Sequence, residues 1–266
     1  MRMIPRRWER RTRLLVIAGL FLISIIVLCF VPPIPLGTSY HLFADDRRLF
    51  GIPNCLNVLS NVPFMIVGVL SLEWLFRKRH EGPFTVRAEW IPYVIFFAGV
   101  TLTGFGSAWY HLSPTSSRLP WDLLPMTCCF MSMVAVTIAE RINSNAGLSV
   151  LLPLLVAGMA SVAYWYFTEA RGHGDYRFYL YVEFVPPLLL GAIVALFPPK
   201  YTATKYLIVA FCFFVAAKLF ELFDRQILGI FRLVSGHSLK HVTAGLACYW
   251  ILVMLKRRKL INDTQV

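Results

Sequence analysis

Residues 14–32 read LLVIAGLFLISIIVLCFVP, a run without a charged side chain. A helix needs about 20 such residues to cross the roughly 30 Å hydrocarbon core of a bilayer. The whole chain has the same character: of its 266 residues 58% are hydrophobic and 15% are charged, and the mean hydropathy is +0.64. Soluble domains average about 45–50% apolar and about 25% charged residues, so the composition excludes a water-soluble globule.

Seven more apolar runs of similar length follow, at 56–76, 90–111, 121–139, 149–167, 178–197, 205–222 and 238–256. The connections are short, and none has the composition of a separate soluble domain. Because backbone in lipid must satisfy its hydrogen bonds internally, the sequence predicts an all-α bundle of eight transmembrane helices. The first run follows a basic segment, as a signal peptide does, but no small-residue cleavage site follows it. We therefore expect a retained span.

The basic residues report topology. The chain has 26 Lys and Arg against 14 Asp and Glu, a formal net charge of +12. With eight spans, seventeen of these cations fall on one side of the membrane, seven on the other and two inside spans. The positive-inside rule then places both termini in the cytoplasm. Because the cations flank apolar runs, the charge is no argument for a nucleic-acid partner.

Four ionisable residues meet at one predicted depth. His111 ends the third span, Asp122 opens the fourth, and His237 and His241 open the eighth, all on the outer side. Such residues are costly in a membrane and are functional candidates by default. The sequence therefore predicts a polar cluster near the outer face. The other histidines fall in connections and are left outside it: His41, His80 and His173.

The spacing of the histidines fits a metal site. His237 and His241 are four residues apart and share one helical face. That pair can occupy two positions around a tetrahedral ion, and His111 can supply a third. Catalytic zinc sites typically have three protein ligands and an open fourth position. A lone His-x-x-x-His also arises by chance, so the prediction depends on the convergence of all three.

Residues beside the cluster add to it. Ser107 lies four positions before His111 and shares its face, while Gly104 and Gly106 would allow a helix or a substrate to approach closely. Asp122 has a second interpretation, because an aspartate at a helix N-terminus can cap free amides.

Other charges inside the spans suit structural roles. Lys218, Glu221 and Asp224 are close enough in sequence for local ion pairs. Glu183 could face a cavity, and the stem of Lys240 could carry its ammonium to the outer interface.

Four motifs together carry a family resemblance. They are GIPNCLNVLSN at 51–61, GFGSAWYH at 104–111, WDLLPM at 121–126 and SGHSLKHVTAG at 235–245. In this order they resemble the alkaline ceramidase family, within the superfamily of seven-span membrane hydrolases that includes the progestin and adipoQ receptors. Bacterial ceramidase-like members are the most similar. The resemblance covers about 40–256 as a seven-span domain, with 1–39 as a basic tail and an extra N-terminal helix and 257–266 as a cytoplasmic tail.

The resemblance implies a chemistry. His111, His237 and His241 would hold zinc, and Ser107 and Asp122 would contact the zinc-bound water or the substrate carbonyl. The family reaction hydrolyses the amide of ceramide, a lipid drawn from the bilayer, to a sphingoid base and a fatty acid. The resemblance also suggests a bacterial inner membrane, with the active site near its outer face.

The chain departs from the family in three places. Lys240 stands where the eukaryotic enzymes have Trp, and Asp122-Leu-Leu replaces an Asp-Glu-Leu motif. In the acidic calcium-binding segment Asp45 and Asp46 are present, but Asn54 takes the place of a Glu. Zinc therefore has more support than calcium as a cofactor.

The leading hypothesis is a zinc-dependent membrane amidase that cleaves ceramide or a related N-acyl lipid. The alternative is a receptor-like or sensor protein with a structural zinc site and no turnover. A transporter would place its polar residues near the midplane and repeat its halves, and neither pattern occurs. The sequence makes no prediction of oligomeric state.

Overall fold

The computed structural model describes residues 9–261, which are mostly helical. The long helices are α1 (Arg10–Phe30), α3 (Val62–Arg77), α4 (Trp90–Leu112), α5 (Leu119–Arg141), α6 (Ser144–Ala170), α7 (Arg177–Leu196), α8 (Thr204–Leu222) and α10 (Gly236–Arg257). The short ones are η1 (Thr38–His41), α2 (Cys55–Leu59), η2 (Arg87–Glu89) and α9 (Asp224–Phe231). Residues 1–8 and 262–266, parts of the two predicted tails, lie outside the described range.

The predicted spans are confirmed to within a few residues. Seven stretches are long and apolar enough to cross a membrane, with α2 and α3 together forming one of them, Cys55–Arg77. The seventh predicted span, 205–222, corresponds to α8, which passes the same test only together with α9, as a pair bent by 79°. Counting α8, the fold is an all-α polytopic bundle of eight spans, as expected.

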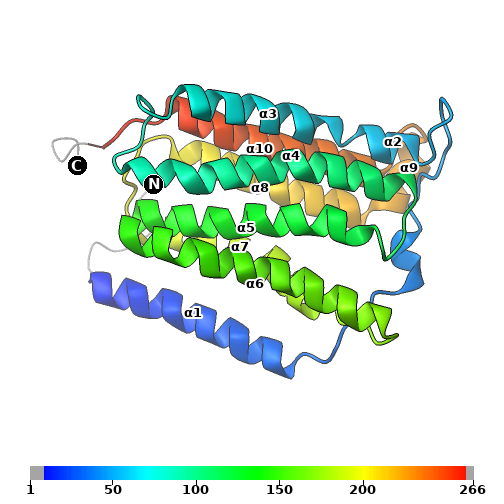
Figure 1. Cartoon of the computed structure of the whole chain (residues 1–266), viewed down its shortest axis with the longest axis horizontal. Helices are drawn as coiled ribbons and strands as arrows, with labels where there is room; N and C mark the ends of the chain where they lie inside the picture. The colour runs from blue at the N-terminus through cyan, green and yellow to red at the C-terminus, as the bar shows by residue number, and fades with distance from the viewer. Residues whose placement is uncertain (1–8, 262–266) are drawn as a thin grey trace.

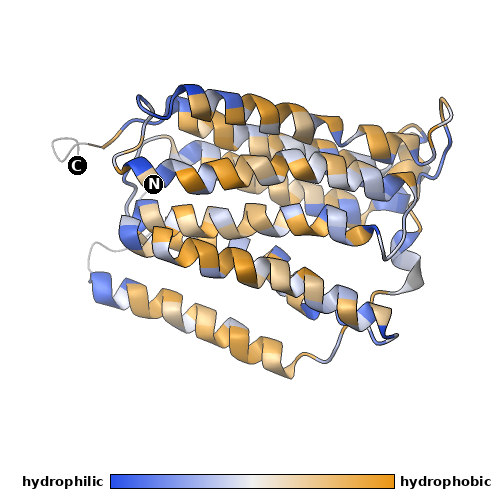
Figure 2. Ribbon diagram, in the orientation of Figure 1, coloured by the Kyte–Doolittle hydropathy of each residue, from blue (hydrophilic) through white to orange (hydrophobic). Residues whose placement is uncertain are grey.

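The helices lie side by side, and both described chain ends lie at one end of the bundle (Figure 1). We call this the tail end; it holds the Arg10 end of α1 and the Arg257 end of α10. At the opposite end, the site end, lie α2, α9 and the first turns of α10. Figure 2 shows hydrophobic residues along the lengths of the helices and hydrophilic ones concentrated toward both ends.

Helix α1 is an addition to a seven-span core. None of residues 10–30 is buried, and α1 packs mainly on α7. The Ser24 hydroxyl and the Tyr181 hydroxyl are hydrogen-bonded at 2.8 Å. An unburied helix this apolar is suited to lipid contact on most of its surface.

At the site end, α4 lies in close contact with its neighbours α3 and α5. A Cβ on Gly106 would lie 1.9 Å from the Trp121 carbonyl oxygen of α5, and one on Gly104 would lie 2.6 Å from Met65 of α3. Only glycine permits such approach between membrane helices. The predicted role of these glycines is confirmed, and it brings Ser107 and Asp122 together.

Candidate metal centre

Three histidines from two helices meet at the site end. His111 lies in the last turn of α4, and His237 and His241 lie in the first turns of α10. All three are buried, with exposed fractions of 0%, 8% and 4%. One nitrogen from each ring lies within 4.8 Å of the others, so the group could hold a metal ion. The predicted convergence of the histidines is confirmed.

The spacing of the ring nitrogens suits a small tetrahedral ion. His111 Nε2 and His237 Nε2 are 3.2 Å apart. Two nitrogens on one zinc ion, each at about 2.0–2.1 Å, would be about 3.3 Å apart. His111 Nδ1 is buried and has no hydrogen-bond partner within residues 9–261. An unpartnered buried polar atom costs about 1–3 kcal/mol. Separately, a cation between His111 Nε2 and His237 Nε2 would accept the lone pairs of both atoms.

Ser60 fixes the orientation of His241. Its hydroxyl donates to the Asn57 carbonyl at 3.0 Å, so it is free to accept the Nδ1 hydrogen of His241 at 2.8 Å. That hydrogen bond places the proton on Nδ1 and leaves the Nε2 lone pair for the cluster. Metal-ligating histidines commonly have such a partner on the second ring nitrogen.

Polar residues of the neighbouring segments hold the start of α10 in place. Asp224, the first residue of α9, accepts a hydrogen bond from the His237 backbone amide at 2.7 Å. Ser235 caps α10 by accepting from the Ser238 amide at 3.1 Å, and the Ser238 hydroxyl donates to Asn57 at 2.8 Å. Asp224 therefore positions a site helix, whereas the sequence suggested local ion pairing.

The segment before α2 packs over the histidines. The Phe43 ring lies 4.5 Å from both the His111 and the His237 ring, centroid to centroid. His41 Nδ1 is 2.8 Å from the Tyr110 hydroxyl, next to His111 in the chain. The expectation that His41 is unconnected to the site is therefore wrong: it ties η1 to the end of α4. Burial lowers the pKa of His41.

The residues of the suspected calcium segment have protein partners. The Asp45 carboxylate accepts two hydrogen bonds from the Arg47 guanidinium, both at 2.7 Å, which hold the pKa of Asp45 below its ordinary value. Asn54 donates to the His111 carbonyl at 2.9 Å, and Asp46 is exposed. Asp45 and Asn54 thus both use their side chains in contacts within the protein.

Ser107 and Asp122 lie beside the histidines. Both side chains are buried, at 1% and 9% exposure, and both line one cavity together with His241. The N-cap of α5 is Arg118, and no side chain caps that helix among the described residues. Asp122 therefore makes no capping hydrogen bond, but it lies in the first turn of α5, where a carboxylate suits the helix dipole.

A cavity of about 210 Å³ extends from this site into the bundle. Its polar end is lined by Ser107, Asp122, Glu183, Glu221, Lys240 and His241. Its other walls are apolar and include Phe96 of α4, Met133 of α5, Leu207 of α8 and Ile251 of α10. Ile251 lies ten residues beyond His241, or about 15 Å along the helix. The shape is suited to a ligand with a polar head and an apolar chain.

The family model of the ceramidases matches residues 51–265. The chain belongs to the ceramidase family. The matched range contains all seven core spans, His111, Asp122 and the His237/His241 pair, and it leaves α1 outside, as the resemblance suggested. Membership in the ceramidase family implies a hydrolase that acts on a membrane lipid. No curated protein matches the chain.

Several residues of this ceramidase-family site were not singled out from the sequence. Ser60 and Asn57 position the histidines, yet in the sequence they are only polar positions of a motif. Asp224 also positions them, although the sequence suggested only a local ion pair for it. The signal was present for Asn57 and Ser60, because both are polar residues within a predicted span. Lys240, expected to extend to the interface, instead lines the cavity and pairs with Glu221 at 2.9 Å.

Proposed function

We propose that the protein is a zinc-dependent amidase that hydrolyses the amide of ceramide or a related N-acyl lipid. The observation that carries the proposal is the cluster of three buried histidines, one of which, His241, lines the polar end of an otherwise apolar cavity. His111, His237 and His241 would hold the zinc through ring nitrogens, and their donor set matches catalytic zinc sites with an open position. The ceramidase family membership supports the reaction class.

Zinc held there would polarise the amide carbonyl and make water acidic enough to attack near neutral pH. Asp122, buried beside the cluster, would accept the proton of the attacking water and return it to the leaving amine. Ser107 would donate a hydrogen bond to the carbonyl oxygen as negative charge develops on it. Both roles need a side chain within hydrogen-bond reach of the groups that react at one amide. Asp122 and Ser107 line the same cavity.

The lipid would reach the site sideways from the bilayer. Helix α8 packs mainly against α10, whereas α7 packs against α5, α1 and α6. Few residues of α7 and α8 approach each other, although both helices line the cavity. An opening between them would admit an acyl chain directly from the hydrocarbon region.

Charge asymmetry supports an orientation. The clusters at Arg77–Arg79 and Lys256–Lys259 both lie at the tail end, which we propose is cytoplasmic. The metal centre would then lie near the outer face, and the resemblance to bacterial members supports a bacterial inner membrane. In a cysteine-free background, a membrane-impermeant maleimide should label Arg171→Cys in intact cells and Arg79→Cys only after lysis.

The central test measures metal and product together. Purified wild-type protein should contain about one zinc per chain and release fatty acid from labelled ceramides. His237→Ala should lose both properties, with His80→Ala, a histidine remote from the centre, as the matched control. Full zinc occupancy and hydrolysis in His237→Ala would overturn the assignment. Zinc and lipid binding without any released fatty acid would favour the receptor-like alternative.

A further inference from the structure

An ion-pair chain crosses three helices beside the metal centre. Lys218 of α8 contacts Glu183 of α7 at 2.8 Å and also contacts Glu221, one turn further along α8. Glu221 contacts Lys240 of α10 at 2.9 Å. The order is Glu183, Lys218, Glu221, Lys240. Lys218 therefore contacts two carboxylates, and Glu221 contacts two ammonium groups. We call these four residues the charge chain.

The charge chain forms part of the cavity wall. All four residues line the cavity. In the sequence, Lys240 lies between two of the candidate metal ligands, His237 and His241. Their side chains keep exposed fractions of 10–30%. Because all four residues line the same cavity, a ligand that reaches the metal centre through the cavity would lie against them.

A purely structural explanation is not the most economical one. Replacing buried ion pairs by apolar residues is often neutral or stabilising, because desolvation cancels the attraction. Apolar side chains could join α7, α8 and α10 at lower cost in a membrane. A chain of four charges facing a ligand cavity therefore suggests recognition.

The balance of the charge chain indicates what it recognises. Two ammonium groups and two carboxylates leave no net charge, yet they offer hydrogen-bond donors and acceptors. A hydroxyl of a lipid headgroup can use both kinds of partner. A carboxylate or an ammonium on the lipid would have no unpaired charge to meet, and an unpaired charge in a low-dielectric site is costly.

We propose that Glu183, Lys218, Glu221 and Lys240 form the headgroup subsite and select uncharged, hydroxyl-bearing N-acyl lipids over charged ones. This inference rests on the proposed function, because it assigns the part of the lipid next to the scissile amide. Glu183 of α7 and Lys218 of α8 contact each other at 2.8 Å between these two helices, so a lipid that enters there would meet them before the metal centre.

The test uses three palmitoyl amides that differ only in headgroup charge: those of ethanolamine (neutral), glycine (anionic) and ethylenediamine (cationic). Each is assayed for kcat/KM and, independently of turnover, for binding through the concentration dependence of Tm. Wild-type protein should prefer the ethanolamide. Glu221→Gln should raise the glycine-to-ethanolamine ratio by about tenfold or more, because it leaves an unpaired cation. Lys218→Gln should raise the ethylenediamine-to-ethanolamine ratio to a similar extent. Glu73→Gln, an exposed carboxylate of α3, is the control and should change neither ratio.

Opposite shifts from opposite charge changes are the result that a structural role alone would not produce. If every variant weakens all three amides by one common factor, or if the ratios stay at their wild-type values, the charge chain is only a brace and the proposal is overturned. If no amide is hydrolysed but the binding ratios shift as expected, the headgroup subsite stands and the amidase assignment fails.

Discussion

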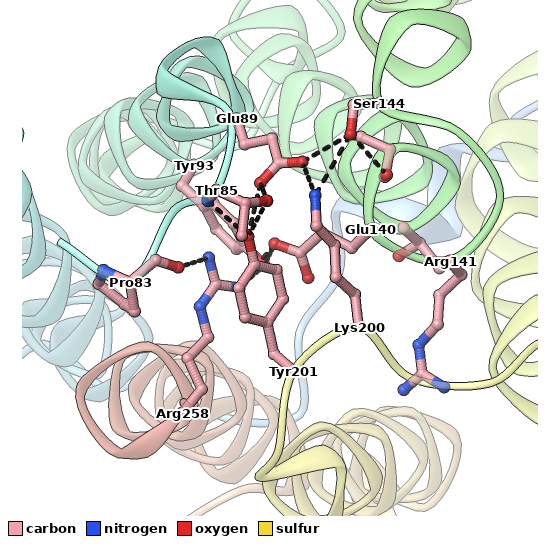
Figure 3. Close-up of polar contacts among 12 residues, drawn as sticks. Pro83, Thr85, Glu89, Tyr93, Glu140, Arg141, Ser144, Lys200, Tyr201 and Arg258 are labelled. Atoms are coloured by element: carbon pink, nitrogen blue, oxygen red, sulfur yellow. Dashed lines mark hydrogen bonds and ion pairs between the residues drawn. The ribbon is translucent and has the colours of Figure 1, made fainter. Parts of the chain in front are cut away.

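Two buried polar groups at opposite ends of the bundle differ in how they are satisfied. At the tail end, the fully buried Glu89 carboxylate accepts hydrogen bonds at 2.6–2.8 Å from three side chains, those of Lys200, Tyr201 and Ser144 (Figure 3). At the site end, His111 is equally buried, but its closest ring partner is another imidazole and its Nδ1 has no partner within residues 9–261.

A second group at the tail end repeats the pattern. Arg258 follows α10 and is almost completely buried, with its side chain 1% exposed. It donates to Glu140 at 2.6 Å, to the Tyr93 hydroxyl at 3.1 Å and to the Pro83 carbonyl at 3.0 Å (Figure 3). The guanidinium also lies 4.2 Å from the centroid of the Tyr201 ring. Arg258 thereby fixes the end of α10 to α4, to α5 and to the loop that contains Pro83.

The difference separates structure from function. Charges in the tail-end network are paired by the protein itself, so they hold helices together and leave little to bind. The site-end histidines gather lone pairs that the protein does not use. Within residues 9–261, these three histidines form the group whose ring nitrogens lie close enough together to hold a metal ion. Substitutions at the site end should therefore reduce activity, whereas substitutions at the tail end should reduce stability.

The largest effect is expected at the site end, in Asp122→Asn. Asparagine keeps the shape but cannot accept the proton of the attacking water, so kcat should fall by about 10²–10⁴-fold. Zinc content and Tm should stay near the wild-type values. Glu140→Gln makes the same change at the tail end and should leave kcat of the folded protein intact. Turnover within tenfold of wild type in Asp122→Asn would remove Asp122 from proton transfer.

The tail end should show the opposite phenotype in Arg258→Met. Removing the guanidinium leaves the Glu140 carboxylate buried without its cation, which typically costs about 3–5 kcal/mol of unfolding free energy. Denaturant unfolding in detergent measures the loss, and kcat of the folded fraction should not change. Arg257→Met, at an exposed neighbour, serves as the control. Equal stability of the two variants would show that the network in Figure 3 does not stabilise the fold.

The sequence could predict the fold because lipid imposes a simple rule on it. Spans are long apolar runs, and their edges are confirmed to within a few residues. The rule places the end of the seventh span correctly at Leu222, but it does not predict α9, which follows α8 at an angle of 79°. Neither proline nor glycine marks that bend, and the polar pair Asp224-Arg225 reads equally well as the end of a span.

The candidate site was predictable where residues of one kind converge at one depth. His111, His237 and His241 satisfy that condition, and the structure brings them together. Pairing between distant helices was not predictable, because periodicity says nothing about which partner a side chain meets. Lys240 was expected at the interface and instead contacts Glu221, and Arg258 was counted only as a topology signal.

A smaller effect is expected for Ser60→Ala, which tests whether the centre binds metal through His241. Without the hydroxyl, the Nδ1 hydrogen of His241 loses its acceptor and the ring loses its fixed orientation. Partners of this type are typically worth about 10–100-fold in metal affinity. Competition with a zinc chelator measures the change, and Ser117→Ala, an exposed serine at the site end, is the matched control. Unchanged affinity would mean that the ring orients without Ser60.

The smallest effect concerns pH and the loop that covers the centre. Hydrogen bonds from Arg47 hold the pKa of Asp45 below its ordinary value, so the folded state favours the ionised carboxylate. Arg47 also donates to the Leu233 carbonyl at 2.8 Å, which ties this loop to the segment before α10. The stabilisation is present above the unfolded pKa of about 3.9 and is lost as the pH falls through the lower folded value.

Asp45→Asn should remove that pH-dependent contribution, about 1 kcal/mol or less because Arg47 is partly exposed. At pH 7 the variant should therefore unfold at a slightly lower Tm than wild type. The gap should close as the pH falls from about 5 towards 3, because the wild-type carboxylate then becomes protonated and loses its ionic partner. Asp46→Asn, on an exposed neighbour, should show no such convergence. A gap that stays constant over this range would mean that Asp45 acts through packing and not through its charge, and the site end would then have no acid-sensitive support from this loop.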